Sequence, residues 1–189
     1  SLERGNVAFA DLNGNGRVDL FGVDQPLQLA FQGNAQGGFE SQPLIFSSTP
    51  SVRMSAANTR LVDVDGDGII GLLSTESTHH LLFRHNPGVG FEGPQAVERI
   101  HNLDQFPDVS FQDRNVKLGD MTGDGLQDMV VLRSGYVAYW PYLGNGSWGS
   151  RVVMMTPPSL PDGFREDRLH LIDIDGCGTS DVVYIDHSR

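Results

Sequence analysis

The sequence has a single cysteine, Cys177, among its 189 residues, so no disulfide bond can form within the chain. No apolar run approaches the ~20 residues that a membrane-spanning helix needs. Basic residues are scarce, since 13 Lys and Arg face 24 Asp and Glu, and the formal net charge is −11. This charge disfavours nucleic acid or an anionic membrane as a partner. We therefore expect no nucleic-acid binding and no membrane insertion by this segment.

Recognisable catalytic motifs are also missing. The sequence contains no G-x-S-x-G, H-E-x-x-H or C-x-x-C pattern. Its histidines show no metal-ligand spacing, and we expect them at the surface or in turns: His79, His80, His85, His101, His170 and His187. The pair His79-His80 falls between two predicted strands, which indicates a loop tip. We predict that the chain is not an enzyme.

The chain also lacks helical periodicity and a leader. No stretch of ten or more residues shows the 3.6-residue period of an amphipathic helix. The first residues have neither the charged nor the apolar region of a signal peptide. We expect the sequence to be a piece of a longer chain.

Four short Asp/Gly loops recur along the sequence at a nearly constant interval. They begin at Asp11, Asp63, Asp120 and Asp173, which are 52, 57 and 53 residues apart. A repeat of about 50 residues is the size of one propeller blade. Aromatic residues keep the same register: Phe31, Phe83 and Trp140 lie 20 residues after the first Asp of their repeat, and Phe39, Phe91 and Trp148 lie 28 residues after it.

Each repeat is predicted to form four short strands. In the third, the strands are expected at residues 115–119, 128–133, 136–141 and 148–154. We therefore predict an all-β fold, a β-propeller with four-stranded blades of the integrin α/FG-GAP type, of which this chain covers about three and a half. The prediction is one partial propeller over 1–189, with repeats at approximately 5–57, 58–114, 115–167 and 168–189, the last truncated. Residues 98–114 and 155–167 are expected to connect blades. The missing blades would come from further sequence or from a second copy of the chain.

The Asp/Gly loops have the composition of calcium sites. In a loop of the form D-x-D-x-D-G-x-x-D, side chains at positions 1, 3, 5 and 9 supply oxygen ligands, and glycine permits the tight turn. The candidate ligands are Asp11, Asn13, Asn15 and Asp19 in the first loop; Asp63, Asp65 and Asp67 in the second; Asp120, Thr122, Asp124 and Asp128 in the third; and Asp173, Asp175 and Asp181 in the fourth.

The four loops are not equivalent. We expect a structural Ca²⁺ first in the third and the first loop, because every ligand position there carries an oxygen donor. The second loop has Gly71 at position 9, and the fourth has the soft sulfur of Cys177 at position 5. An EF-hand is excluded, because position 12 is not Glu and strands flank the loops. The alternative is a metal-free hairpin whose aspartates cap backbone N–H groups.

The loops and the turns that follow them resemble FG-GAP/VCBS repeats, the units of integrin α-like propellers. A closer resemblance lies in the third and fourth repeats. There Val116–Asp128, followed by the run Tyr-Trp-Pro-Tyr-Leu-Gly-Asn-Gly-Ser-Trp-Gly at 139–149, is similar to the propeller of the B component of bacterial insecticidal toxin complexes. In that family this is the middle/N-terminal region, between an SpvB-like region and RHS repeats.

The resemblance implies a secreted, non-enzymatic docking module. Such a module attaches the cocoon formed by the B and C components to the channel of the A component, and gates it. Its partners would be the toxin-complex A component and, through the rest of the chain, the C component. Two alternatives stay open: an FG-GAP/VCBS adhesin or lectin-like module that binds host protein or glycan, and part of an enzyme whose active site lies elsewhere in a longer chain.

Overall fold

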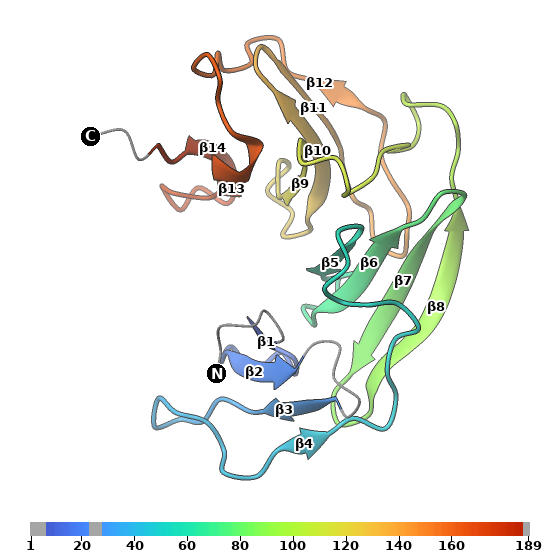
Figure 1. The fold of residues 1–189 in the computed structure, drawn as a ribbon, viewed down its shortest axis with the longest axis vertical. Helices are drawn as coiled ribbons and strands as arrows, with labels where there is room; N and C mark the ends of the chain where they lie inside the picture. The colour runs from blue at the N-terminus through green and yellow to red at the C-terminus, as the bar shows by residue number, and fades with distance from the viewer. Residues whose placement is uncertain (1–6, 23–27, 187–189) are drawn as a thin grey trace. The chain divides into compact units, whose positions relative to one another are not determined.

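The computed structural model describes residues 7–22 and 28–186. The strands in these ranges form three antiparallel sheets of four strands and one sheet of two strands (Figure 1). The described residues contain one short 3₁₀ helix, η2 (Glu166–Arg168), and no α-helix. The predicted all-β fold of four-stranded, blade-like sheets is therefore confirmed.

Each sheet follows the chain order of its strands. The first contains β1 (Val7–Ala10), β2 (Asp19–Gly22), β3 (Leu29–Phe31) and β4 (Leu44–Ile45). The second contains β5 (Thr59–Val62), β6 (Gly71–Thr75), β7 (His79–Asn86) and β8 (Gly90–Glu98). The third contains β9 (Val116–Gly119), β10 (Asp128–Arg133), β11 (Tyr136–Trp140) and β12 (Val152–Val153), and the last pairs β13 (Leu169–Ile172) with β14 (Asp181–Tyr184). Every Asp/Gly loop thus connects the first two strands of its sheet.

The chain divides into two compact units, Ser1–Val97 and Glu98–Arg189. The first unit has one apolar core to which both of its sheets contribute, including Phe21 from β2 and Leu72 from β6. The core of the second unit joins Val130 and Leu132 of β10 to Leu169 of β13. The second strands β6 and β10 are the most buried: every residue of β6 is buried, as are the first five residues of β10.

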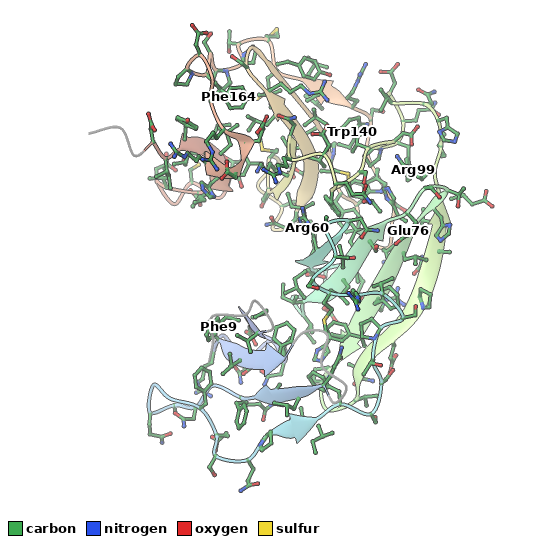
Figure 2. The ribbon with its side chains drawn as sticks, viewed as in Figure 1. Phe9, Arg60, Glu76, Arg99, Trp140 and Phe164 are labelled. Carbon is green, nitrogen blue, oxygen red and sulfur yellow. The ribbon has the colours of Figure 1, made fainter. Side chains whose placement is uncertain are left out.

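The aromatic residues found in register do not all share one environment. Phe83, Phe91 and Trp140 are almost completely buried, whereas Phe39 is 43% exposed. The indole Nε1 of Trp140 donates a hydrogen bond of 2.7 Å to the Leu103 carbonyl. This bond holds the connection before β9, in which Arg99 forms an ion pair of 2.6 Å with Asp108; Figure 2 labels Trp140 and Arg99.

Three local predictions need correction. The third and fourth strands of the third sheet are both shorter than predicted. β11 ends at Trp140, because the next residue, Pro141, has no amide to donate. In the fourth strand only Val152 and Val153 pair with β11. The prediction of a loop tip at His79-His80 is wrong, because both residues belong to β7 and the turn lies before them. His80 is 1% and His85 6% exposed, so the prediction of surface or turn positions is wrong for both histidines.

Candidate functional site

The first aspartate of each loop folds the loop around its carboxylate. In the third loop, Asp120 Oδ1 accepts hydrogen bonds from the amides of Thr122 (3.2 Å) and Gly123 (2.6 Å), and Oδ2 accepts one from Gly125 (2.8 Å). Gly123 and Gly125 have φ values of 80° and 87°, which glycine adopts without steric cost. The first aspartates of the other loops, Asp11, Asp63 and Asp173, accept equivalent backbone bonds.

The fifth position adds a second turn in three of the loops. The side-chain oxygen of Asp124 accepts a bond of 2.9 Å from the Leu126 amide, two residues further on. Asp67 and Asn15 make the same contact with Ile69 and Arg17. In the fourth loop the thiol of Cys177 instead lies 3.2 Å from the Thr179 hydroxyl. Aspartates therefore cap backbone amides in these loops, as in the metal-free hairpin that the sequence left open as the alternative.

The aspartate at position 9 has a role that the sequence did not reveal. Asp128 is completely buried, and its two oxygens accept bonds of 2.8 Å from the amides of Met121 and Tyr142. Asp19 is equally buried, and its carboxylate accepts hydrogen bonds from the amides of Leu12 (3.0 Å) and Gly33 (2.8 Å). In both sheets one carboxylate therefore ties the Asp/Gly loop to the chain that follows the third strand.

Burial also changes the acidity of this group. Loss of hydration raises the pKa of the Asp128 carboxyl above its ordinary value, while its two amide hydrogen bonds act in the opposite direction. The negative charges of Asp124 and Asp120 raise this pKa further. The carboxylates of the third loop therefore repel one another, and a cation placed among them would relieve that repulsion.

Among the described residues, three acidic or sulfur ligands come together in the second and fourth loops, but Asp120, Asp124 and Asp128 of the third loop do not. Carboxylate oxygens of Asp63, Asp65 and Asp67 lie within 4.8 Å of one another. The same holds for Asp173, Asp175 and the Cys177 sulfur, all of which are exposed. Asp181 at position 9 accepts a bond of 3.2 Å from the Ile174 amide and so faces the base of its loop. Oxygen donors at such separations suit a hard cation.

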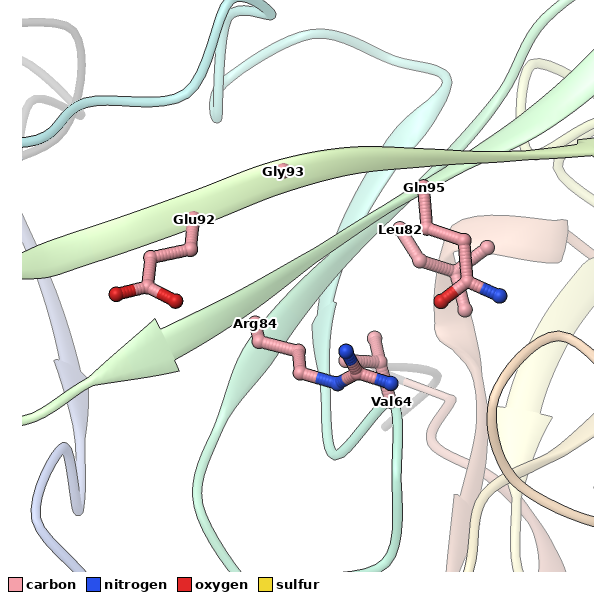
Figure 3. A pocket seen from close by; sticks show the side chains of 6 residues that line it. All are labelled: Val64, Leu82, Arg84, Glu92, Gly93 and Gln95. Carbon is pink, nitrogen blue, oxygen red and sulfur yellow. The ribbon is translucent and has the colours of Figure 1, made fainter.

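Two polar pockets adjoin the second loop. A pocket of about 170 Å³ is lined by the residues drawn in Figure 3: Val64, Leu82, Arg84, Glu92, Gly93 and Gln95. A second, of about 250 Å³, shares Val64, Arg84 and Glu92 with the first and reaches Asp65 and Asp67. Arg84 Nε lies 2.7 Å from Asp65 Oδ2. Carboxylate, amide and guanidinium groups therefore line these pockets beside apolar side chains.

His85 joins the first two sheets. Its Nδ1 lies 2.8 Å from the Leu12 carbonyl in the first Asp/Gly loop, so this nitrogen carries the proton and donates. The ring also packs against Phe46 and Phe91, with centroids 5.2 and 4.9 Å away. Its buried Nε2 has no hydrogen-bond partner among the described residues. Burial lowers the pKa of His85, although the Leu12 contact and the charges of Asp19 and Asp67 act to raise it.

Comparisons with known proteins agree with this architecture. Residues 120–184 match the FG-GAP-like repeat family. A structure of the Photorhabdus luminescens Tc holotoxin pore superimposes with a TM-score of 0.75 at 22% identity, over 97% of this chain and 8% of that chain. The TcdB2–TccC3 crystal structure gives 0.50 at 12% identity, over 94% of this chain and 14% of that one. The resemblance to FG-GAP-like repeats and to a toxin-complex propeller region, predicted from the sequence, is confirmed.

A lectin also shares the fold. The Agrocybe aegerita lectin, described as recognising non-reducing terminal N-acetylglucosamine, superimposes with a TM-score of 0.60 at 20% identity, over 92% of this chain and 44% of that chain. No curated protein sequence matches the chain significantly. At these identities the similarities show the fold alone, and the chain spans only a small part of the toxin-complex chains.

The two hydrogen bonds that Asp128 accepts lead to a prediction about stability. An asparagine side chain at this position would keep one acceptor oxygen and turn an NH₂ group toward an amide that also donates. Because an unsatisfied buried amide costs about 1–3 kcal/mol, Asp128→Asn should lower the free energy of unfolding by that amount, or the melting temperature by roughly 2–4 °C per kcal/mol. Thermal melts in EDTA measure the change. Asp162→Asn, in an exposed loop, is the control, and equal melting of the two variants would contradict the prediction.

The lowered pKa of His85 predicts that the stability of the fold depends on pH. Because its pKa in the folded state lies below the ordinary 6.5, folding favours the neutral ring. The resulting stability is complete above pH 6.5 and is lost as the pH falls through the folded-state pKa. We expect the urea midpoint of the wild type to fall between pH 7.5 and 5, and that of His85→Gln, which keeps a donor, to fall less. Parallel pH profiles for the two proteins would exclude His85 as the cause.

Proposed function

We propose that this chain is a non-enzymatic docking module of a toxin-complex B component. The observation that carries the proposal is the fold similarity to a Tc holotoxin pore structure over 97% of the chain. The closer sequence resemblance at 116–128 and 139–149 supports the same family. In this role the module attaches the cocoon of the B and C components to the A-component channel and gates it, and it acts outside the bacterial cell.

Two further observations support a role in protein assembly. The structures that share the fold include parts of multi-subunit Tc complexes. The edge strand β12 and the residues after it expose a short apolar run, in which Val153 is 47% and Met155 is 98% exposed. Exposed apolar side chains that lie next to one another are typical of protein contact surfaces.

No helix in the described part of the chain is long and apolar enough to span a membrane.

A deletion tests the docking role. Removal of this segment from the B component that carries it should abolish binding to the A component, because the attachment surface is lost, while B and C still assemble. Binding to immobilised A component and co-elution of B with C are the two measurements. Undiminished binding to A after the deletion would refute the docking role. Loss of B–C assembly would show instead that the segment belongs to the cocoon.

A second candidate function is glycan binding. The polar pockets around Arg84 and Glu92 favour it, because carboxylate, amide and guanidinium groups can bond sugar hydroxyls, and a lectin shares the fold. A glycan array separates the two functions. Specific binding that Glu92→Ala abolishes would support the lectin-like role, and the absence of binding would leave the docking role as the better account.

We further propose that a structural Ca²⁺ supports the third and the first loops. The mutual repulsion of Asp120, Asp124 and Asp128 favours a cation in the third loop. In the first loop Asp11, Asn13 and Asn15 offer oxygen donors around the same kind of turn. The ion would be structural and would fix the loop that joins the first two strands of a sheet.

Calcium should therefore raise the melting temperature. A ligand at 100 times its Kd adds about 2.7 kcal/mol to the stability of the folded state, which is a shift of several degrees. We expect a rise in millimolar Ca²⁺ relative to EDTA, with Mg²⁺ as the control for ionic strength. Asp124→Ala should melt at a lower temperature than the wild type in Ca²⁺, and Cys177→Ala should change little. If Asp124→Ala and the wild type melt alike in both Ca²⁺ and EDTA, the third loop is not a stabilising metal site.

A further inference from the structure

The second Asp/Gly loop differs from the other three at position 9, and its backbone explains the difference. Gly71 stands where the other loops have Asp19, Asp128 and Asp181. A Cβ atom at Gly71 would overlap the Phe83 carbonyl oxygen and would lie 2.9 Å from Val64 Cγ2. Strand β7 passes too close to this position for any side chain. The carboxylate that binds two backbone amides in the first and third loops is therefore sterically excluded from the second.

The positively charged side chain of Arg84 lies beside this loop. Arg84 Nε lies 2.7 Å from Asp65 Oδ2, and Arg84 lines the 250 Å³ pocket together with Asp65 and Asp67. The Asp65 side chain is 20% exposed and that of Arg84 is 52% exposed, so solvent screens this pair in part. The guanidinium group thus contacts one of the three carboxylates whose oxygens converge within 4.8 Å.

The repeats show that this arginine is specific to the loop without a position-9 carboxylate. Arg84 directly follows Phe83, one of the aromatic residues in register. The corresponding residues are Gln32 after Phe31 and Pro141 after Trp140, and neither carries a charge. Among the three repeats that contain this position, the one that has lost the position-9 aspartate is thus the one that has a cation there.

We propose that the Arg84 guanidinium is the built-in cation of the second Asp/Gly loop, and that it replaces the metal ion for which such loops are otherwise suited. The positive charge offsets the repulsion among Asp63, Asp65 and Asp67, and it is covalently attached, so the loop keeps its conformation without Ca²⁺. A metal ion at these carboxylates would have to displace Arg84 from Asp65 and would meet the repulsion of a nearby positive charge. The inference does not depend on whether the other loops bind Ca²⁺.

Removal of the charge should therefore create a metal site. We expect Arg84→Gln to bind one Ca²⁺ more per chain than the wild type, as counted by isothermal titration calorimetry and native mass spectrometry. Its melting temperature should also rise more between EDTA and millimolar Ca²⁺. The additional ion should disappear in Arg84→Gln combined with Asp67→Asn, which would locate it in the second loop. Arg84→Lys keeps a charge and should bind no additional ion.

Arg133→Gln is the matched control. Arg133 is exposed to a similar extent, 57% against 52% for Arg84, and it also pairs with an aspartate, Asp113, but outside the Asp/Gly loops. This variant should bind as many Ca²⁺ ions as the wild type. If Arg84→Gln also binds only the wild-type number, Arg84 is not the cation of the loop and the inference is overturned.

A second measurement requires no change at Arg84. In the otherwise wild-type chain, Asp67→Asn should leave both the number of bound Ca²⁺ ions and the calcium-dependent rise in melting temperature unchanged. A loss of one ion in this variant would show that Ca²⁺ occupies the second loop beside Arg84, which also overturns the inference. Ca²⁺ binding by the wild type tests the first and third loops, whereas the difference between variants tests Arg84, so either result can fail alone.

Discussion

The hydrogen bonds from backbone amides to the carboxylate of the first aspartate are the interaction on which each Asp/Gly loop depends. A turn this tight leaves several N–H groups without a backbone acceptor, and a carboxylate has two oxygens that can each accept more than one bond. Asp120 satisfies the amides of Thr122, Gly123 and Gly125 in this way. Because the loop joins the first two strands of a sheet, these bonds also help to fix the register in which β9 and β10 pair.

The same chemistry creates an electrostatic problem, which the second loop meets differently from the first and the third. Each loop concentrates carboxylates within a few residues, and their repulsion opposes the conformation that the hydrogen bonds favour. Burial of Asp19 and Asp128 adds a cost of desolvation, which two amide bonds to each carboxylate offset. Where that carboxylate cannot fit, at Gly71, an arginine lies beside the remaining acids. The residue at position 9 therefore separates the second loop from the first and the third.

The sequence was sufficient for what is local and repeated. The spacing of the first aspartates predicted the successive sheets, and the loop glycines predicted tight turns, in which they have positive φ. Contacts made far along the chain were beyond it. Asp128 accepts a hydrogen bond from the Tyr142 amide 14 residues away, and His85 meets the Leu12 carbonyl 73 residues away. A motif at positions 1 to 9 carries no signal for either contact.

The loops also connect neighbouring repeats, which explains why their conformation matters beyond one sheet. Within the first unit, the Leu12 carbonyl accepts the hydrogen bond from His85 of the next repeat. Within the second, the Asp120 carbonyl accepts one of 2.6 Å from the Ser180 amide of the following repeat. Both carbonyls belong to Asp/Gly loops whose own amides are bound by carboxylates, so the loop presents an acceptor to the next repeat from a fixed position. A carboxylate that orders one turn therefore also orders the junction between two sheets.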